Sequence, residues 1–294
     1  MRDRKVSIMN RIYEEIMDLT GADEFKELIQ KWDVLSHNLQ SNPQRMPRLL
    51  PNLLWVGNSG IGRTKLMKLM SSYLASRGNL IDFYGDVKFF EFLLSYTPKD
   101  APFRELQRLE DELSAAKGFR NEFRGAVLID IDPWVTHYDE LYFTGFMEYL
   151  AAHSDKWLIV LSVSQMEESK LQNLEAFLSM FLRLDKITLP LPKSEDLFSF
   201  VTRKLGEHGL SADESAKELL LRTINELREN LYFDGYKTIS MLCQDIVYEH
   251  FSSPNTGNTV LSAGDLDAFA PGSNYVKKAI KNSRNRIGFT PEEV

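Results

Sequence analysis

The stretch that decides the fold of this chain is Gly57-Asn58-Ser59-Gly60-Ile61-Gly62-Arg63-Thr64. It follows an apolar run, 53–56, that is typical of a buried strand, and it precedes a segment, 66–74, with the apolar spacing of a helix. The pattern G-x-x-x-x-G-K-[ST] at such a junction forms a phosphate-binding P-loop, in which backbone N–H groups surround the phosphates at a helix N-terminus. The chain keeps the glycines and the hydroxyl of Thr64, but Arg63 stands in the position of the lysine. We therefore predict that residues 57–64 bind the phosphates of a nucleotide.

An acid at the end of a second apolar strand supports this interpretation. The run 126–130 closes on Asp130, some 66 residues after Thr64, where nucleotide-binding proteins of this class place the acid that organises Mg²⁺. In a P-loop the hydroxyl that follows the lysine position also holds this ion. We predict Thr64 and Asp130 as the metal-side pair of a bound nucleotide with Mg²⁺. The alternative for Asp130 is an acid that caps a loop.

Length and composition limit the class of protein. The chain has 294 residues, of which 43% are hydrophobic and 26% charged, and this suits a globular protein with one large and one smaller domain. A net charge of −7 argues against a broad nucleic-acid-binding surface. No apolar run reaches the ~20 residues of a membrane span, and the polar start leads into no signal-peptide core, so we expect a cytoplasmic location. The single cysteine, Cys243, excludes an internal disulfide, and its apolar helical setting predicts a buried structural thiol.

Strand-like and helix-like segments alternate through the first two thirds of the chain. Two helices are expected within 7–40, separated at Gly21, and a proline-containing connector leads into the P-loop strand. Further strands are expected at 80–84, 126–130, 157–162 and 186–190. Further helices are expected at 87–96, 103–117, 138–153 and 168–182. This alternation predicts an α/β fold, a P-loop NTPase with a doubly wound parallel sheet and its ligand at the carboxyl ends of the strands.

After Pro192 the pattern changes to helices alone, which are expected at 194–208, 212–229 and 235–251. We therefore expect four parts, which are an N-terminal helical segment (1–45), a P-loop α/β domain (46–192), an all-helical domain (193–272) and a basic tail (273–294). The tail carries Lys277, Lys278, Lys281, Arg284 and Arg286. It is expected to be a helix or a frayed terminus, with an anion-binding arm as the alternative.

The order of these features resembles an AAA+ ATPase and, within that superfamily, the CbxX/CfxQ branch, the relatives of red-type rubisco activase. The resemblance spans about residues 15–250 and includes Leu19–Lys26 (LTGADEFK), Leu50–Leu53 before the P-loop and Glu195–Leu197 at the entrance of the helical domain. It implies that the all-helical domain is the C-terminal AAA+ lid. It also implies that the nucleotide is ATP or ADP, and that the chain forms an oligomer, of one or several kinds of chain, that acts on a protein partner.

Four departures from the family pattern fall on groups that act in the reaction. Arg63 replaces the P-loop lysine. Asp130 matches the metal-organising aspartate of the family, called the Walker B aspartate, and Ile131 replaces the water-activating glutamate that follows it. The segment Phe177–Phe181 lacks the arginine fingers, which contribute about 10³–10⁵ in rate. Lys237 aligns with the sensor 2 arginine and keeps its charge without the planar fork. The catalytic candidates left by this comparison are Asp132 and Lys237.

Other residues could compensate for these departures. Asp132 follows Asp130 by two positions and could replace the missing glutamate if the chain turns at Pro133. Arg183 lies near the position of the fingers, and sensor 1 would fall at Ser162 or Ser164. These candidates come from the resemblance and from position along the chain.

From these features we expect a divergent AAA+ nucleotide-binding protein that acts as a regulatory or scaffold protein through protein contacts, with weak or partner-dependent hydrolysis. One alternative is an active AAA+ ATPase that remodels a protein partner. The segment Asp86–Glu91 argues against threading, because it contains no glycine where relatives carry a glycine-rich pore loop. A DNA-transaction ATPase is the other alternative, and only the basic tail favours it.

Overall fold

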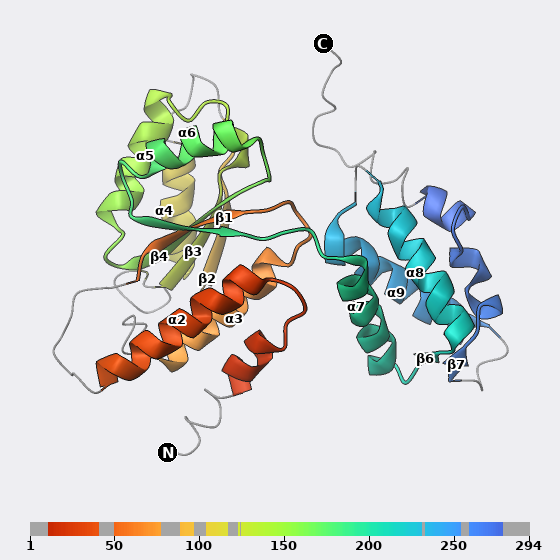
Figure 1. The fold of residues 1–294 in the computed structure, drawn as a ribbon. Coiled ribbons are helices and arrows are strands. Elements are labelled where there is room, and N and C mark those ends of the chain that lie inside the picture. The colour runs from red at the N-terminus through yellow and green to blue at the C-terminus, as the bar shows by residue number, and fades with distance from the viewer. Residues whose placement is uncertain are drawn as a thin grey trace, which may run out of the picture. The chain divides into compact units, whose positions relative to one another are not determined.

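The chain forms two compact units, which Figure 1 shows with their elements labelled. The first unit contains Met1–Asn58 and Arg63–Pro190, and the second contains Ser59–Gly62 and Leu191–Val294. The computed structural model describes residues 11–40, 50–77, 89–96, 104–116, 123, 125–230, 233–253 and 259–278.

A parallel sheet forms the centre of the first unit. Its strand order is β2-β3-β4-β1-β5, and each neighbouring pair is parallel. The strands are β1 (Asn52–Val56), β2 (Phe89–Leu93), β3 (Gly125–Asp130), β4 (Trp157–Val163) and β5 (Leu184–Thr188). Every residue of β1 and β4 is buried, as expected for strands that are covered on both faces.

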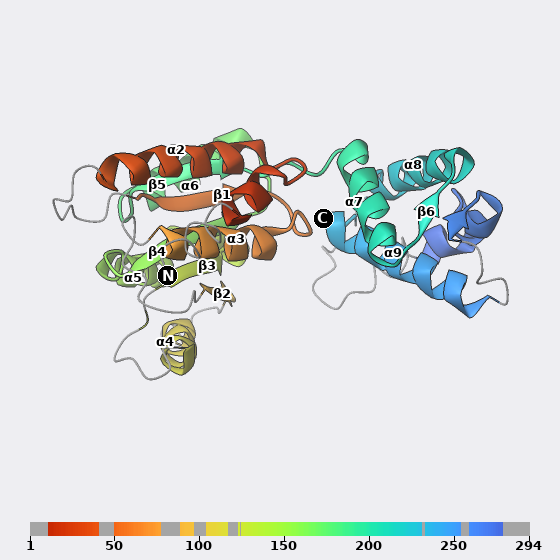
Figure 2. The same ribbon diagram turned by 90° about the horizontal axis from the view of Figure 1, so that it is seen from below.

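Helices cover both faces of this sheet. They are α2 (Asp23–Gln40), α3 (Arg63–Ser76), α4 (Arg104–Ala116), α5 (Leu141–Ala152) and α6 (Glu168–Leu178). Figure 1 shows α2 and α3 on one face and α5 and α6 on the other, and Figure 2 shows α4 beside β2 and α2 beside β5. Because side chains alternate along a strand, Leu54 and Val56 join the core under α5 and α6. Trp55 instead meets Phe25 of α2, with ring centroids 6.1 Å apart. The predicted doubly wound α/β fold is confirmed.

One predicted element is wrong in the part of the chain that the structure describes. A helix was predicted over 87–96, but Phe89–Leu93 forms strand β2. The apolar run at 89–94 fits both a helical and an alternating pattern, and periodicity alone cannot decide so short a run. Phe92 is buried and Glu91 is exposed, and pairing with β3 fixes this alternation. The strand expected at 80–84 lies outside the described residues.

The other elements follow the sequence closely. The break predicted at Gly21 is confirmed, since Gly21 (φ 71°) and Ala22 (φ 56°) adopt left-handed conformations just before α2 begins. A short 3-10 helix that was not predicted, η1 (Asp132–Trp134), follows β3. Within the described part of the chain, no helix combines the length and the apolar character needed to span a membrane.

The second unit is built mainly from helices, as predicted, but it also contains one pair of short strands that the prediction of helices alone did not include. Its elements are α7 (Ser194–Glu207), α8 (Glu214–Arg228), α9 (Gly235–Ser252), a 3-10 helix η2 (Gly264–Phe269) and two short paired strands, β6 (Ser211–Ala212) and β7 (Val260–Leu261). Asp213 caps α8 by accepting a hydrogen bond from the backbone N–H of Ala216 at 2.8 Å, and this satisfies one free donor of the first turn. Of the five basic tail residues, Lys277 and Lys278 are described, and the other three lie outside the described residues.

The single cysteine is part of the core of the second unit. Cys243 lies on α9 and is buried among apolar residues of α7 and α8. Burial raises the pKa of its thiol to about 12, since the thiolate would lose its hydration. The predicted structural role of this cysteine agrees with its burial.

We predict that Cys243 does not react with Ellman's reagent at pH 8 while the protein is folded. The thiol stays protonated below its raised pKa of about 12, and only the thiolate is a strong nucleophile. The same protein in guanidinium chloride should react fully, because the pKa then returns to about 8.5. Fast reaction of the folded protein would show that α9 opens readily or that the thiol is exposed.

Candidate functional site

The P-loop has the backbone conformation that its glycines allow. Gly57 continues from β1, and its N–H donates to the carbonyl of Val163 at the end of β4, at 2.9 Å. Gly60 (φ 77°) and Gly62 (φ 91°) lie in the left-handed region, which residues with a Cβ rarely adopt. Helix α3 then begins at Arg63. The loop therefore ends at a helix N-terminus, where free N–H groups can receive an anion.

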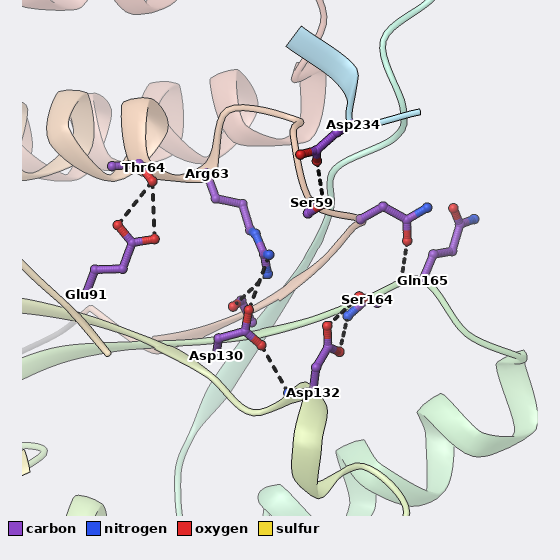
Figure 3. Close-up of polar contacts among 11 residues, drawn as sticks. Ser59, Arg63, Thr64, Glu91, Asp130, Asp132, Ser164, Gln165 and Asp234 are labelled. Carbon is purple, nitrogen blue, oxygen red and sulfur yellow. Dashed lines mark hydrogen bonds and ion pairs between the residues drawn. The ribbon is translucent and has the colours of Figure 1, made fainter. Parts of the chain in front are cut away.

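Arg63 is directed toward the carboxyl ends of β3 and β4 (Figure 3). Its Nη2 lies 3.3 Å from Oδ2 of Asp130, and its Nη1 donates to Oγ of Ser162 at 2.9 Å. Asp130 and Ser162 are direct neighbours across the β3–β4 pair. The two terminal nitrogens of one guanidinium therefore contact two adjacent strands. The positive charge of Arg63, at the position of the P-loop lysine, is thus bound by the side chains of Asp130 and Ser162.

Asp130 lies in a partly buried, polar surrounding. Burial raises the pKa of its carboxyl above the ordinary value, and the neighbouring Arg63 guanidinium acts in the opposite direction. The backbone N–H of Asp132 donates to Oδ1 of Asp130 at 3.1 Å. Asp130 therefore both pairs with Arg63 and holds the start of the turn that follows β3.

Thr64 contacts a carboxylate that the sequence did not reveal. Its hydroxyl lies 3.2 and 3.1 Å from the two carboxylate oxygens of Glu91 on β2, and Figure 3 shows this pair beside Arg63 and Asp130. Because a helix was predicted over 87–96, Glu91 was not recognised as a residue of the site. An alternating interpretation of the same run, with Phe90 and Phe92 on one face, would have placed Glu91 on the other.

The position that follows Asp130 belongs to the core. Ile131, at the position where the resemblance noted above places a water-activating glutamate, is fully buried and packs in the main apolar cluster of the first unit. Its backbone N–H donates to the carbonyl of Ser162 at 3.0 Å. The side chain at this position therefore lies among apolar residues.

Asp132 is engaged by the neighbouring strand end. The chain turns into η1 at this residue, as Pro133 allows. The Asp132 carboxylate accepts the backbone N–H of Ser164 and also the Ser164 hydroxyl. These hydrogen bonds join the chain after β3 to the chain after β4, so the carboxylate has a structural role in this arrangement.

The remaining sequence candidates in the first unit have different surroundings. Ser162 is buried and accepts from Arg63, whereas Ser164 donates to Asp132. Asn58 accepts the backbone N–H of Gln165 at 3.1 Å. The Arg183 side chain is exposed just before β5 begins. The structure thus brings together the predicted residues Arg63, Asp130, Asp132, Ser162 and Ser164.

The tip of the loop is packed within the second unit. The Ser59 hydroxyl donates to Oδ1 of Asp234 (Figure 3), and the N–H of Tyr236 donates to the carbonyl of Gly60 at 2.8 Å. A Cβ on Gly60 would lie 1.9 Å from the carbonyl oxygen of Asp234, so only glycine fits there. Lys237 belongs to the same unit, where its ammonium lies 3.6 Å from Oδ2 of Asp234.

The two predicted metal ligands have different partners in the structure. Mg²⁺ requires oxygen ligands that converge at 2.0–2.1 Å in near-octahedral geometry. Thr64 is directed at Glu91, whereas Asp130 is paired with the Arg63 cation. Among the described residues, no group of three or more histidine, cysteine and acidic side chains could hold a metal ion. This donor set, as arranged, does not fit a resident Mg²⁺.

We predict that Ile131→Glu destabilises the protein and does not restore a catalytic group. A carboxylate among the core residues would lack a partner, and the free energy of unfolding should fall by about 3 kcal/mol or more. The matched change Ile131→Val should cost about 1 kcal/mol. Urea unfolding followed by circular dichroism measures both changes. An unchanged midpoint for Ile131→Glu would show that this side chain reaches solvent.

Comparison with known proteins identifies the fold. No protein-family model matches the sequence, and no curated protein does either. The chain is similar to the solved structure of C. elegans PCH-2, with 17% identity and a TM-score of 0.55, over 93% of this chain and 73% of PCH-2. Two variants of Thermotoga maritima RuvB align at 12% identity with TM-scores of 0.47 and 0.49. Those alignments cover 89% and 90% of this chain and 71% and 70% of the RuvB chains. At such identity the likeness to PCH-2 shows the fold alone, and that fold is the AAA+ P-loop fold.

Proposed function

We propose that this chain is a divergent AAA+ protein that binds ATP or ADP at residues 57–64 and acts as a regulatory or scaffold member of a protein assembly. Its own hydrolysis is weak or depends on a partner. The observation that carries this proposal is the burial of Ile131 in the core, at the position where relatives place the water-activating glutamate. The acidic residue that directly follows it, Asp132, accepts hydrogen bonds from Ser164.

Binding and hydrolysis depend on different groups. Phosphate binding uses backbone N–H groups of the loop and the N-terminus of α3, and the loop keeps the glycine conformations that this requires. Hydrolysis needs groups that act in the transition state, such as a base and an arginine finger. The first set is present, while the second is replaced or engaged elsewhere. The geometry therefore supports a nucleotide-binding protein with little turnover of its own.

A protein partner is supported by one face of α9. Met241, Tyr248 and Phe251 are 49%, 72% and 52% exposed. They follow each other at i, i+7 and i+10, which places them on one side of the helix. Contiguous exposed apolar side chains mark contact surfaces more often than isolated ones do. The oligomeric state, the four-part division of the chain, the role of Lys237 and the cytoplasmic location stay predictions from the sequence.

The direct test is nucleotide titration of the full chain with fluorescent ATP and ADP analogues, followed by phosphate release. We expect saturable binding and a turnover below about 0.01 s⁻¹, against the 1 s⁻¹ or more of ordinary enzymes. A turnover of about 1 s⁻¹ would instead support an active remodelling ATPase. Absence of binding to either nucleotide would refute the proposal, and salt-sensitive retention on DNA would favour a DNA-transaction protein.

A loop variant with a matched control locates the binding. Gly62→Ala places a Cβ at a φ of 91°, and the strained loop should bind nucleotide about tenfold more weakly. Gly145→Ala in α5 has nothing within 4 Å of the new Cβ, so it should leave binding unchanged. Equal affinity of the two variants would place the nucleotide away from the loop.

A further inference from the structure

We propose that the nucleotide site of this chain works without a bound Mg²⁺ ion, because the Arg63 guanidinium supplies at Asp130 the positive charge that a metal would otherwise supply. This inference rests on the nucleotide binding proposed above. It concerns which cation the site uses and which nucleotide species it prefers.

The first step is the fit of the guanidinium between two strand ends. Arg63 contacts Asp130 on β3 and Ser162 on β4 through different terminal nitrogens, at 3.3 and 2.9 Å. A planar fork of donors can reach both at once, whereas the compact ammonium of lysine is a single point charge. The substitution at position 63 therefore gives the site a contact that a lysine would not make in the same way.

The second step is the permanence of this cation. The Arg63 side chain is 15% exposed and that of Asp130 is 24% exposed, so water screens the pair only partly. Arginine stays protonated at all ordinary pH values. A metal ion that approaches Asp130 must displace a charge that is covalently attached to α3. Arg63 and Mg²⁺ therefore compete for the same carboxylate.

The third step is the direction of Thr64. In a metal-binding P-loop the hydroxyl and the strand-end acid share one ion. Here the Thr64 hydroxyl lies against Glu91, and Figure 3 shows this pair and the Arg63–Asp130 pair as separate contacts. Mg²⁺ tolerates little departure from octahedral geometry. Both predicted ligands would have to leave their partners before they could share an ion.

Nucleotide titrations with and without metal test this inference. We expect the wild-type affinities for a fluorescent ATP analogue in excess MgCl₂ and in EDTA to agree within about threefold. In Arg63→Gln, Asp130 loses its cation, so metal-free binding should weaken and Mg²⁺ should restore it by about tenfold or more. Arg104→Ala, at the exposed first residue of another helix, α4, serves as the matched control and should behave as wild type.

Direct metal binding gives a second measurement that needs no nucleotide. Mn²⁺ prefers the same oxygen ligands as Mg²⁺ and is visible by electron paramagnetic resonance. Arg63→Gln should bind Mn²⁺ more tightly than wild type does, because Asp130 loses its competing cation, and the double change Arg63→Gln with Asp130→Asn should bind it no more tightly than wild type. Circular dichroism checks that each variant is folded.

The outcomes separate this inference from the proposed function. A wild-type affinity for the ATP analogue that rises tenfold or more with Mg²⁺, or an affinity for Mn²⁺ that Arg63→Gln does not raise above that of wild type, would overturn the metal-independent site. Wild-type protein that binds no nucleotide in either buffer would overturn the proposed function, while the Mn²⁺ measurement would still decide which cation Asp130 prefers. Metal-independent binding by wild type together with metal-dependent binding by Arg63→Gln would support both.

Discussion

The contact between Arg63 and Asp130 connects the start of α3 to the end of β3, and the polar groups of the site are arranged around it. A carboxylate at the end of a buried strand needs a compensating charge, because desolvation disfavours its ionised form. In most P-loops a metal ion contributes this charge. Here a side chain contributes it, and the same guanidinium also reaches Ser162 on the neighbouring strand. The charge balance of the site is therefore built into the polypeptide.

Around this contact, two residues that follow Asp130 have structural surroundings. Ile131 packs in the core, and Asp132 accepts two hydrogen bonds from Ser164. Buried apolar contacts and satisfied polar networks stabilise the fold, but neither arrangement leaves a free base for water. The backbone of the loop keeps the left-handed conformations of Gly60 and Gly62, and these conformations do not depend on the side chains of Ile131 and Asp132. The proposed nucleotide binding therefore requires the backbone of the loop and no catalytic base.

The sequence predictions that depend on neighbouring residues were correct, whereas one that depends on a distant strand was wrong. The strand before residues 57–62 and the helix after them, the strand that ends at Asp130 and the helices after Pro192 were predicted correctly, because long periodic segments and glycine patterns are local signals. Strand β2 was predicted as a helix, since its short aromatic run fits both periods and its pairing partner, β3, lies more than 30 residues away. Glu91 was missed for the same reason, and so was its contact with Thr64.

The sequence by itself determined that an arginine occupies the lysine position, that an isoleucine follows Asp130, and that strands alternate with helices before an all-helical region. Only the tertiary structure decided what these residues do. Strands that are distant in sequence but adjacent in the sheet direct Arg63 toward Asp130. The same packing places the side chain at position 131 in the core and not in water. The direction of a side chain at a strand end is set by packing and hydrogen bonding between such strands. The spacing of residues along one segment therefore cannot predict this direction.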